Sequence, residues 1–184
     1  MKEHNFNEHW FYKSVNEEEF HPVDLPHDAM LQEKRSLDSK GQHNIGWFEA
    51  EDYMYKKTFS LAEEYKDHKI VFEFEGVYHD AEVYLNGEKI AYRPYGYTNF
   101  YVDATNYVNY DGENELCVTA KNSDQPNSRW YSGTGIYRPV WMYTGTQEAI
   151  AVNGVKIQTI SIQKEERSAR VEIKVETYQE GEAE

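Results

Sequence analysis

The sequence predicts an all-β protein, built as an antiparallel sandwich or barrel. Three observations lead to this fold class: many short segments alternate apolar and polar residues, an Asn-Gly pair separates two of them, and no long amphipathic helix pattern occurs. Alternation gives each strand one apolar face, and strands without helical crossovers pair as antiparallel neighbours. With 39% hydrophobic and 15% aromatic residues, the chain of 184 residues can form a packed core.

The first part of the chain, residues 1–46, shows little periodicity, and Trp10 and Phe20 are scattered among charged residues. We therefore expect an extended arm that wraps over the sandwich and is held by its aromatic side chains. His27 and Asp28 stand together in this arm, but no third ligand follows at metal spacing. A turn-forming role is favoured over a metal site.

Regular alternation begins at Tyr53 and predicts strands with one buried face each. The expected inward-facing sets are Tyr53, Tyr55 and Phe59; Ile70, Phe72 and Phe74; Ala81, Val83 and Leu85; and Leu116, Val118 and Ala120. After the third set, Asn86-Gly87 predicts a tight type I′ hairpin turn, because both central positions of that turn need positive φ.

Two further features shape the end of this region. The segment DATNYV, residues 103–108, predicts a single helical turn with Asp103 or Thr105 as its cap. GIYRPVWMYTG predicts the last strand, in which Pro139 must lie at an edge, a bulge or the first position because it has no N–H to donate. Arg138 is expected to be structural, as a buried hydrogen-bonding fork in this strand.

Composition changes at residues 144–146, which predicts a first domain over residues 1–145 and a second over residues 146–184. The second contains two strand patterns, VKIQTISIQ and ARVEIKVETY, and a short third near Ile150. Three strands cannot form a free-standing sandwich. This segment is therefore expected to be the first part of an incomplete sandwich, either poorly ordered alone or paired with another copy.

The charge balance excludes some partners. The chain has 33 acidic residues against 19 Lys and Arg, a net charge of -14, so we expect neither nucleic acid nor membrane binding. The one cysteine, Cys117, lies in an alternating pattern without an adjacent base, which favours a packed residue over a nucleophile. No apolar run resembles a signal peptide or a membrane span, so a cytoplasmic protein without metal or cofactor is expected.

The segment that most suggests a function covers residues 127–141, NSRWYSGTGIYRPVW. Aromatic faces stack on the apolar faces of sugar rings, and planar polar groups bind sugar hydroxyls, so Asn127, Arg129 and Trp130 are candidate carbohydrate contacts. The alternative is that the two glycines only shape a turn and the aromatics cap the core. Asp124 is the nearest carboxylate, for which a turn-forming role is favoured.

Six segments, taken in order, resemble the N-terminal sugar-binding domain of the family 2 glycoside hydrolases, the β-galactosidase and β-glucuronidase group. They are VDLPHDA, in which Ala29 stands where the family usually has Trp, then YKKTFSL, AEVYLNGEKI, GYTNFYVDAT, GENELCVTAKN and SRWYSGTGIYRPVWM. The last is similar to the family's most specific signature, W-x-x-G-G/S-I-Y-R-x-V-W. The resemblance covers roughly residues 8–145.

This resemblance implies a jelly-roll, galactose-binding-like antiparallel β-sandwich, followed by the start of an immunoglobulin-like β-sandwich. It also implies a (β/α)8 barrel further along, which carries both carboxylates of the retaining reaction, about 5–5.5 Å apart. No such barrel is present here, so no catalytic residue is assigned and the fragment is expected to be inactive. The resemblance further implies that a loop of the first domain contacts the sugar at the rim of the active site. The corresponding candidates are Asp124, Asn127, Arg129 and Trp130, with Gly133 and Gly135 as structural residues.

The preferred hypothesis is the N-terminal, non-catalytic part of a retaining glycosidase, with a β-galactosidase favoured over a β-glucuronidase. Its expected partners are a carbohydrate substrate, the barrel of the same full-length chain and a second copy of the chain. One alternative is a free-standing carbohydrate-binding module, and another is a purely structural packing or oligomerisation domain. We expect no measurable sugar binding by this chain alone, because a rim loop supplies only part of a pocket.

Overall fold

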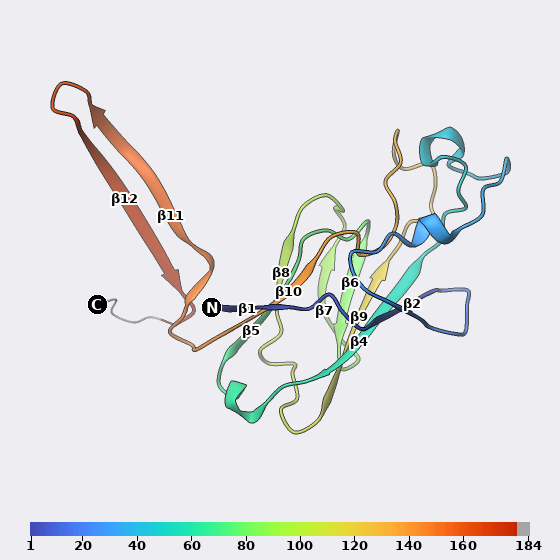
Figure 1. Ribbon diagram of the computed structural model, residues 1–184, viewed down its shortest axis with the longest axis horizontal. Coiled ribbons are helices and arrows are strands. Elements are labelled where there is room, and N and C mark those ends of the chain that lie inside the picture. Colours follow the sequence, from blue (N-terminus) through green and yellow to red (C-terminus); the bar gives the residue numbers. More distant parts are fainter. Residues whose placement is uncertain (180–184) are drawn as a thin grey trace.

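Two antiparallel sheets packed face to face form the main body of the protein, and a separate two-stranded hairpin projects from it (Figure 1). The computed structural model describes residues 1–179. One sheet has the order β1-β10-β5-β8 and the other the order β3-β2-β4-β9-β6-β7. The predicted antiparallel jelly-roll sandwich is therefore confirmed. Within the described residues, no helix is long and apolar enough to cross a membrane.

The strands of the four-stranded sheet are β1 (Lys2–Asn5), β10 (Val140–Gly145), β5 (Lys69–Phe74) and β8 (Phe100–Asp103). Those of the six-stranded sheet are β3 (His21–Val23), β2 (Trp10–Ser14), β4 (Tyr53–Ser60), β9 (Glu113–Ala120), β6 (Ala81–Leu85) and β7 (Glu88–Arg93). Three short 3-10 helices lie in the connections: η1 (Ala29–Gln32), η2 (Gln42–Ile45) and η3 (Glu63–Tyr65).

The core lies between the two sheets and contains the inward-facing residues that the alternation predicts. All of them are buried except Phe59, which is partly exposed and packs against the core. One prediction for β5 was wrong, because Val71 and Glu73 on its other face are buried too. The hydroxyls of Tyr101 and Tyr143 on the neighbouring strands both reach Glu73, and these rings help to cover it.

The predicted turns have mixed outcomes. Asn86 and Gly87 join β6 to β7 with φ values of 53° and 83°, as the type I′ prediction requires. Residues 103–108 form a single hydrogen-bonded turn, in which the Tyr107 N–H donates to the Ala104 carbonyl at 2.9 Å, but no helix. The Asp103 carboxylate accepts from the Thr105 N–H at 3.0 Å, so Asp103 is the cap, as one of the two predictions had it.

The arm prediction was only partly correct. Residues 1–46 contain three strands, of which β1 and β3 form one edge of each sheet. The backbone groups at a sheet edge are unpaired until another strand binds to them, which favours strands in this arm. Trp10 is buried and donates from Nε1 to the Phe6 carbonyl at 2.7 Å. Phe20 stays outside the core, with Lys56 Nζ 4.1 Å from the centre of its ring.

The hairpin consists of β11 (Ile150–Gln163) and β12 (Ser168–Thr177). It projects from one end of the sandwich, and residues 30–50 and 123–135 lie at the opposite end (Figure 1). The separate short strand expected near Ile150 is part of β11, with an irregular register after it. The two strands pair with each other, so the described part is an ordered hairpin. The last residues of the predicted second domain, 180–184, lie outside the described residues, and its immunoglobulin-like nature stays a prediction.

Replacing Gly135 with alanine should destabilise the sandwich strongly. Gly135 has a φ of 122°, and a β-carbon there would overlap the Tyr55 hydroxyl in the core. We expect a loss of about 2–4 kcal/mol in the free energy of unfolding, measured by urea denaturation. Gly112→Ala is the matched control, because no atom lies within 4 Å of the position that its β-carbon would take. Equal stability of the two variants would contradict this account.

Candidate functional site

The signature segment, residues 127–141, is fixed by backbone hydrogen bonds from two sides. His27 N–H donates to the Ile136 carbonyl and Ala29 N–H donates to the Thr134 carbonyl, both at 2.8 Å. On the other side, Gly135 and Tyr78 exchange two backbone hydrogen bonds of 2.9 and 3.0 Å. The segment therefore lies between two loops that are far apart in the sequence.

Asp28 is the side chain that holds this arrangement. Its carboxylate accepts from the Tyr131 hydroxyl at 2.7 Å, from Thr134 N–H at 2.9 Å and from Met30 N–H at 3.2 Å. Burial, together with the bond to Asp28, raises the pKa of Tyr131. A β-carbon on Gly133 would meet the carboxylate at 2.5 Å, so glycine is needed there for space as well as for its φ of 69°.

The His27 side chain is held against strand β4, and its turn-forming role stays a prediction. Its Nδ1 lies 2.9 Å from the Tyr55 hydroxyl, and burial lowers the pKa of the imidazole. No group of three or more potential metal ligands occurs within the described residues. Cys117 is similarly a packed residue, since burial raises the pKa of its thiol to about 11, which disfavours the nucleophilic thiolate.

Asn127 is exposed, but its amide is largely engaged within the protein. Nδ2 donates to the Asn122 side-chain oxygen at 2.7 Å and to the Asp124 carbonyl at 2.9 Å. It also lies 3.1 Å from Nε2 of His79. These bonds fix the loop. The Asn127 oxygen accepts one long hydrogen bond, from the Tyr78 hydroxyl at 3.4 Å, and its second lone pair can accept from a ligand.

Trp130 is 59% exposed and belongs to a group of rings that we call the aromatic shelf: Tyr78, His79, Tyr95, Tyr97 and Trp130. Tyr95 and Tyr97 are exposed as well, whereas Tyr78 is buried and supports them. Ring centres are 5.6 Å apart for Tyr95 and Tyr97, 5.2 Å for Tyr97 and Tyr78, and 4.7 Å for Tyr78 and His79. Trp130 Nε1 donates to the Tyr97 hydroxyl at 2.9 Å. The exposed rings of Tyr95, Tyr97 and Trp130, held in this way, offer apolar faces to a sugar.

Sequence reasoning missed four of the five shelf residues. Tyr95 and Tyr97 come from the connection between β7 and β8, and Tyr78 and His79 from the segment before β6. Two tyrosines separated by one glycine, in PYGYTN, were the available signal, because tyrosines in a loop have no core to fill. Only folding places that loop beside Trp130.

The other two predicted contacts, Arg129 and Asp124, lie exposed on the same loop but outside the shelf. No hydrogen bond to either side chain occurs within residues 1–179. Arg138 contradicts its prediction. It is exposed, it precedes β10 rather than lying within it, and its guanidinium carbon is 5.4 Å from the centre of the Tyr137 ring. The strand starts only after Pro139, so Arg138 is not carried into the sheet.

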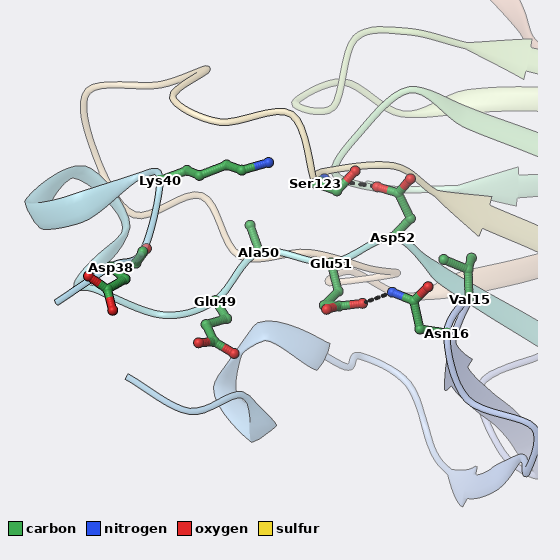
Figure 2. Close-up of a pocket in the computed structure, with 10 residues that line it drawn as sticks. Val15, Asn16, Asp38, Lys40, Glu49, Ala50, Glu51, Asp52 and Ser123 are labelled. Atoms are coloured by element: carbon green, nitrogen blue, oxygen red, sulfur yellow. Dashed lines mark hydrogen bonds between the residues drawn. The ribbon is translucent and has the colours of Figure 1, made fainter. Parts of the chain in front are cut away.

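A cavity of about 530 Å³ lies beside the start of the rim loop, residues 124–131 (Figure 2). Two of its four acidic side chains serve as anchors. Glu51 accepts from Ser14 Oγ at 2.7 Å and from Asn16 Nδ2 at 2.6 Å. Asp52 accepts from the N–H groups of Asn122 and Ser123, both at 2.8 Å. The cavity wall thus holds the rim loop in place.

Comparisons with known proteins agree with this geometry. Residues 10–147 match the family model described as glycosyl hydrolase 2 galactose-binding domain-like. The β-galactosidase BoGH2A of Bacteroides ovatus is 42% identical over 120 residues, which are 65% of this chain and 14% of that protein. A β-galactosidase of Thermoanaerobacter pseudethanolicus is 32% identical over 156 residues, 75% of this chain and 20% of that protein.

A solved structure shows the same fold over nearly the whole chain. The crystal structure of a β-glycosidase from Bacteroides vulgatus superposes with a TM-score of 0.87 and 27% identity, covering 98% of this chain and 25% of that one. The chain therefore spans a quarter or less of the length of each of these proteins.

Removing the Asp28 carboxylate should release the signature loop. Asp28→Ala leaves the Tyr131 hydroxyl and Thr134 N–H without their acceptor. We expect the free energy of unfolding to fall by about 2–4 kcal/mol, and hydrogen exchange to quicken at the amide of Thr134. Asp124→Ala is the control and should change stability by less than about 0.5 kcal/mol, because its exposed side chain makes no such bonds. Unchanged exchange in Asp28→Ala would rule out this role.

Proposed function

Because the chain belongs to the galactose-binding-like domain family of the family 2 glycoside hydrolases, we propose that it is the non-catalytic N-terminal part of a retaining β-galactosidase. The observation that carries the proposal is the family match over residues 10–147, together with relatives that are far longer than this chain. A β-galactosidase is preferred to the β-glucuronidase alternative because the relative with 42% identity bears that name.

In this proposal the aromatic shelf and the Asn127 oxygen stand at the rim of an active site that another domain completes. Trp130 supplies an exposed face for stacking. The Asp28 carboxylate, through its hydrogen bonds to Tyr131 and Thr134, keeps the loop in position. Such a loop recognises the sugar but performs no chemistry, since hydrolysis with retention needs two carboxylates about 5–5.5 Å apart on either side of the bond.

The test uses this chain and a chimera. The chain alone should not hydrolyse nitrophenyl-β-galactoside, whereas the B. ovatus β-galactosidase with its corresponding domain replaced by residues 10–147 of this chain should do so. In the chimera, Trp130→Ala should lower kcat/KM about fivefold to tenfold through lost stacking. Phe11→Ala, an exposed aromatic on β2 outside the shelf, should not.

Turnover by the isolated chain that survives repurification would contradict the proposal. A folded chimera without turnover would contradict it as well. Melting curves of each protein distinguish a failure to fold from a failure to act.

We also propose that the hairpin is the start of a second, immunoglobulin-like sandwich. Cross-strand pairing places five apolar residues on one face of it: Val155, Ile157, Val171, Ile173 and Val175. They are 48–68% exposed, whereas Lys156, Gln158, Glu172 and Lys174 form the opposite face. A strand pair with one apolar face needs a covering layer, which supports an unfinished sandwich.

This uncovered face should make the chain bind hydrophobic dyes and associate at high concentration. Replacing Ile157 and Ile173 with lysine should reduce the fluorescence of bound anilinonaphthalene sulfonate and shift light scattering towards monomer. Gln158→Lys on the opposite face is the control and should leave both unchanged. Equal dye binding by all three proteins would mean that this face is not the exposed apolar surface.

A further inference from the structure

A pocket of about 330 Å³ opens beside the aromatic shelf, on the outer side of the four-stranded sheet. It is lined by Glu73, Glu75, Tyr97, Thr98, Asn99 and Arg138. Its volume lies at the low end of the range of roughly 300–1,000 Å³ for small-molecule sites. We propose that this pocket binds one neutral pyranose unit of an oligosaccharide whose next unit lies on the shelf, an inference that rests on the proposed function.

The floor of the pocket is a fully bonded carboxylate. Glu73 is only 8% exposed, and it accepts from Asn99 Nδ2 at 2.7 Å and from the Tyr101 hydroxyl at 2.6 Å. The Tyr143 hydroxyl lies 2.9 Å from Glu73 and 2.9 Å from Glu3, and its one proton serves both carboxylates. A buried charge with three donors is held rigidly. Asn99 Nδ2 donates to Glu73 and to the Tyr101 hydroxyl, which fixes the orientation of the Asn99 amide. Asn99 Oδ1 accepts no hydrogen bond within residues 1–179.

Two opposite charges line the walls without pairing. Glu75 accepts from Trp141 Nε1 at 2.7 Å through one oxygen, and its second oxygen has no donor among the described residues. The Arg138 guanidinium makes no ion pair or hydrogen bond within residues 1–179. A planar guanidinium donates to two neighbouring oxygens, and a carboxylate accepts from a hydroxyl. Together they match adjacent hydroxyls of a sugar ring.

The charges also select the kind of sugar. Two carboxylates against one guanidinium leave the pocket with a net negative charge, which disfavours a uronate and admits a neutral ring.

The pocket and the shelf are continuous through one side chain. Tyr97 lines the pocket, and its hydroxyl accepts the Trp130 indole N–H at 2.9 Å. A ring in the pocket and a ring on Trp130 would therefore be neighbours, as successive units of one oligosaccharide are. The site consequently favours a chain of at least two neutral sugars over a monosaccharide.

The experiment uses two indole groups as separate reporters. Trp141 donates to Glu75 in the pocket, and Trp130 donates to Tyr97 on the shelf, so their indole N–H resonances report on the two places separately. The 184-residue chain, labelled with nitrogen-15, is titrated to tens of millimolar with galactobiose, galactose and digalacturonate. We expect the Trp141 resonance to shift and saturate with galactobiose, to respond more weakly to galactose and not to respond to digalacturonate.

Variants test the residues. Arg138→Gln should raise the dissociation constant for galactobiose, read from the Trp141 shift, at least about tenfold. This is the effect of losing hydrogen bonds from a charged donor. Arg170→Gln, on the exposed strand β12, is the matched control and should keep the full response. Glu75→Gln is the second variant if Arg138→Gln loses its folded amide spectrum, and it should weaken binding in the same direction.

The outcomes separate this inference from the rim-loop proposal. A shift of both indoles with galactobiose supports the pocket and its continuity with the shelf. A shift of Trp141 without Trp130 keeps the pocket, but it overturns the second sugar unit on the shelf and counts against the rim role. A shift of Trp130 alone, or of neither indole, overturns the pocket. An equal response to digalacturonate overturns the selection for a neutral sugar.

Discussion

One carboxylate, that of Asp28, joins the parts of the chain on which the candidate site depends. It binds the Tyr131 hydroxyl and Thr134 N–H across more than a hundred residues of sequence, and it does so only because Gly133 leaves the space. Gly135 then turns under the Tyr55 hydroxyl. Asp28 thereby adds to the bonds of Asp52 and Asn127 that hold the rim loop, which as a surface connection has little core of its own.

The two ends of the sandwich differ in what they leave exposed. At one end, loops hold polar and aromatic side chains whose hydrogen bonds are largely satisfied, so rings such as Trp130 are exposed in fixed orientations. At the other end, the hairpin exposes Ile157 and Ile173 without any covering layer. Fixed exposed rings suit recognition of a small polar ligand, whereas an uncovered aliphatic face suits packing against more protein.

Electrostatics separates structural from recognition roles among the acidic residues. Glu73, Glu51 and Asp52 accept several hydrogen bonds each, and they stabilise loops and strands. Glu75 keeps one oxygen without a donor among the described residues and faces a pocket that also holds Arg138. A net charge of -14 therefore says little about ligands by itself, because most of these carboxylates are solvated or already bonded.

The sequence by itself determined the strand faces, the Asn86-Gly87 turn and the family, because alternation and positive φ are properties of neighbouring residues. It also marked the loop that carries Asn127 and Trp130. Only the tertiary structure brought Tyr97 to Trp130, covered Glu73 and exposed Arg138. Those outcomes depend on where irregular loops run, and such loops have no period from which a distant neighbour can be inferred.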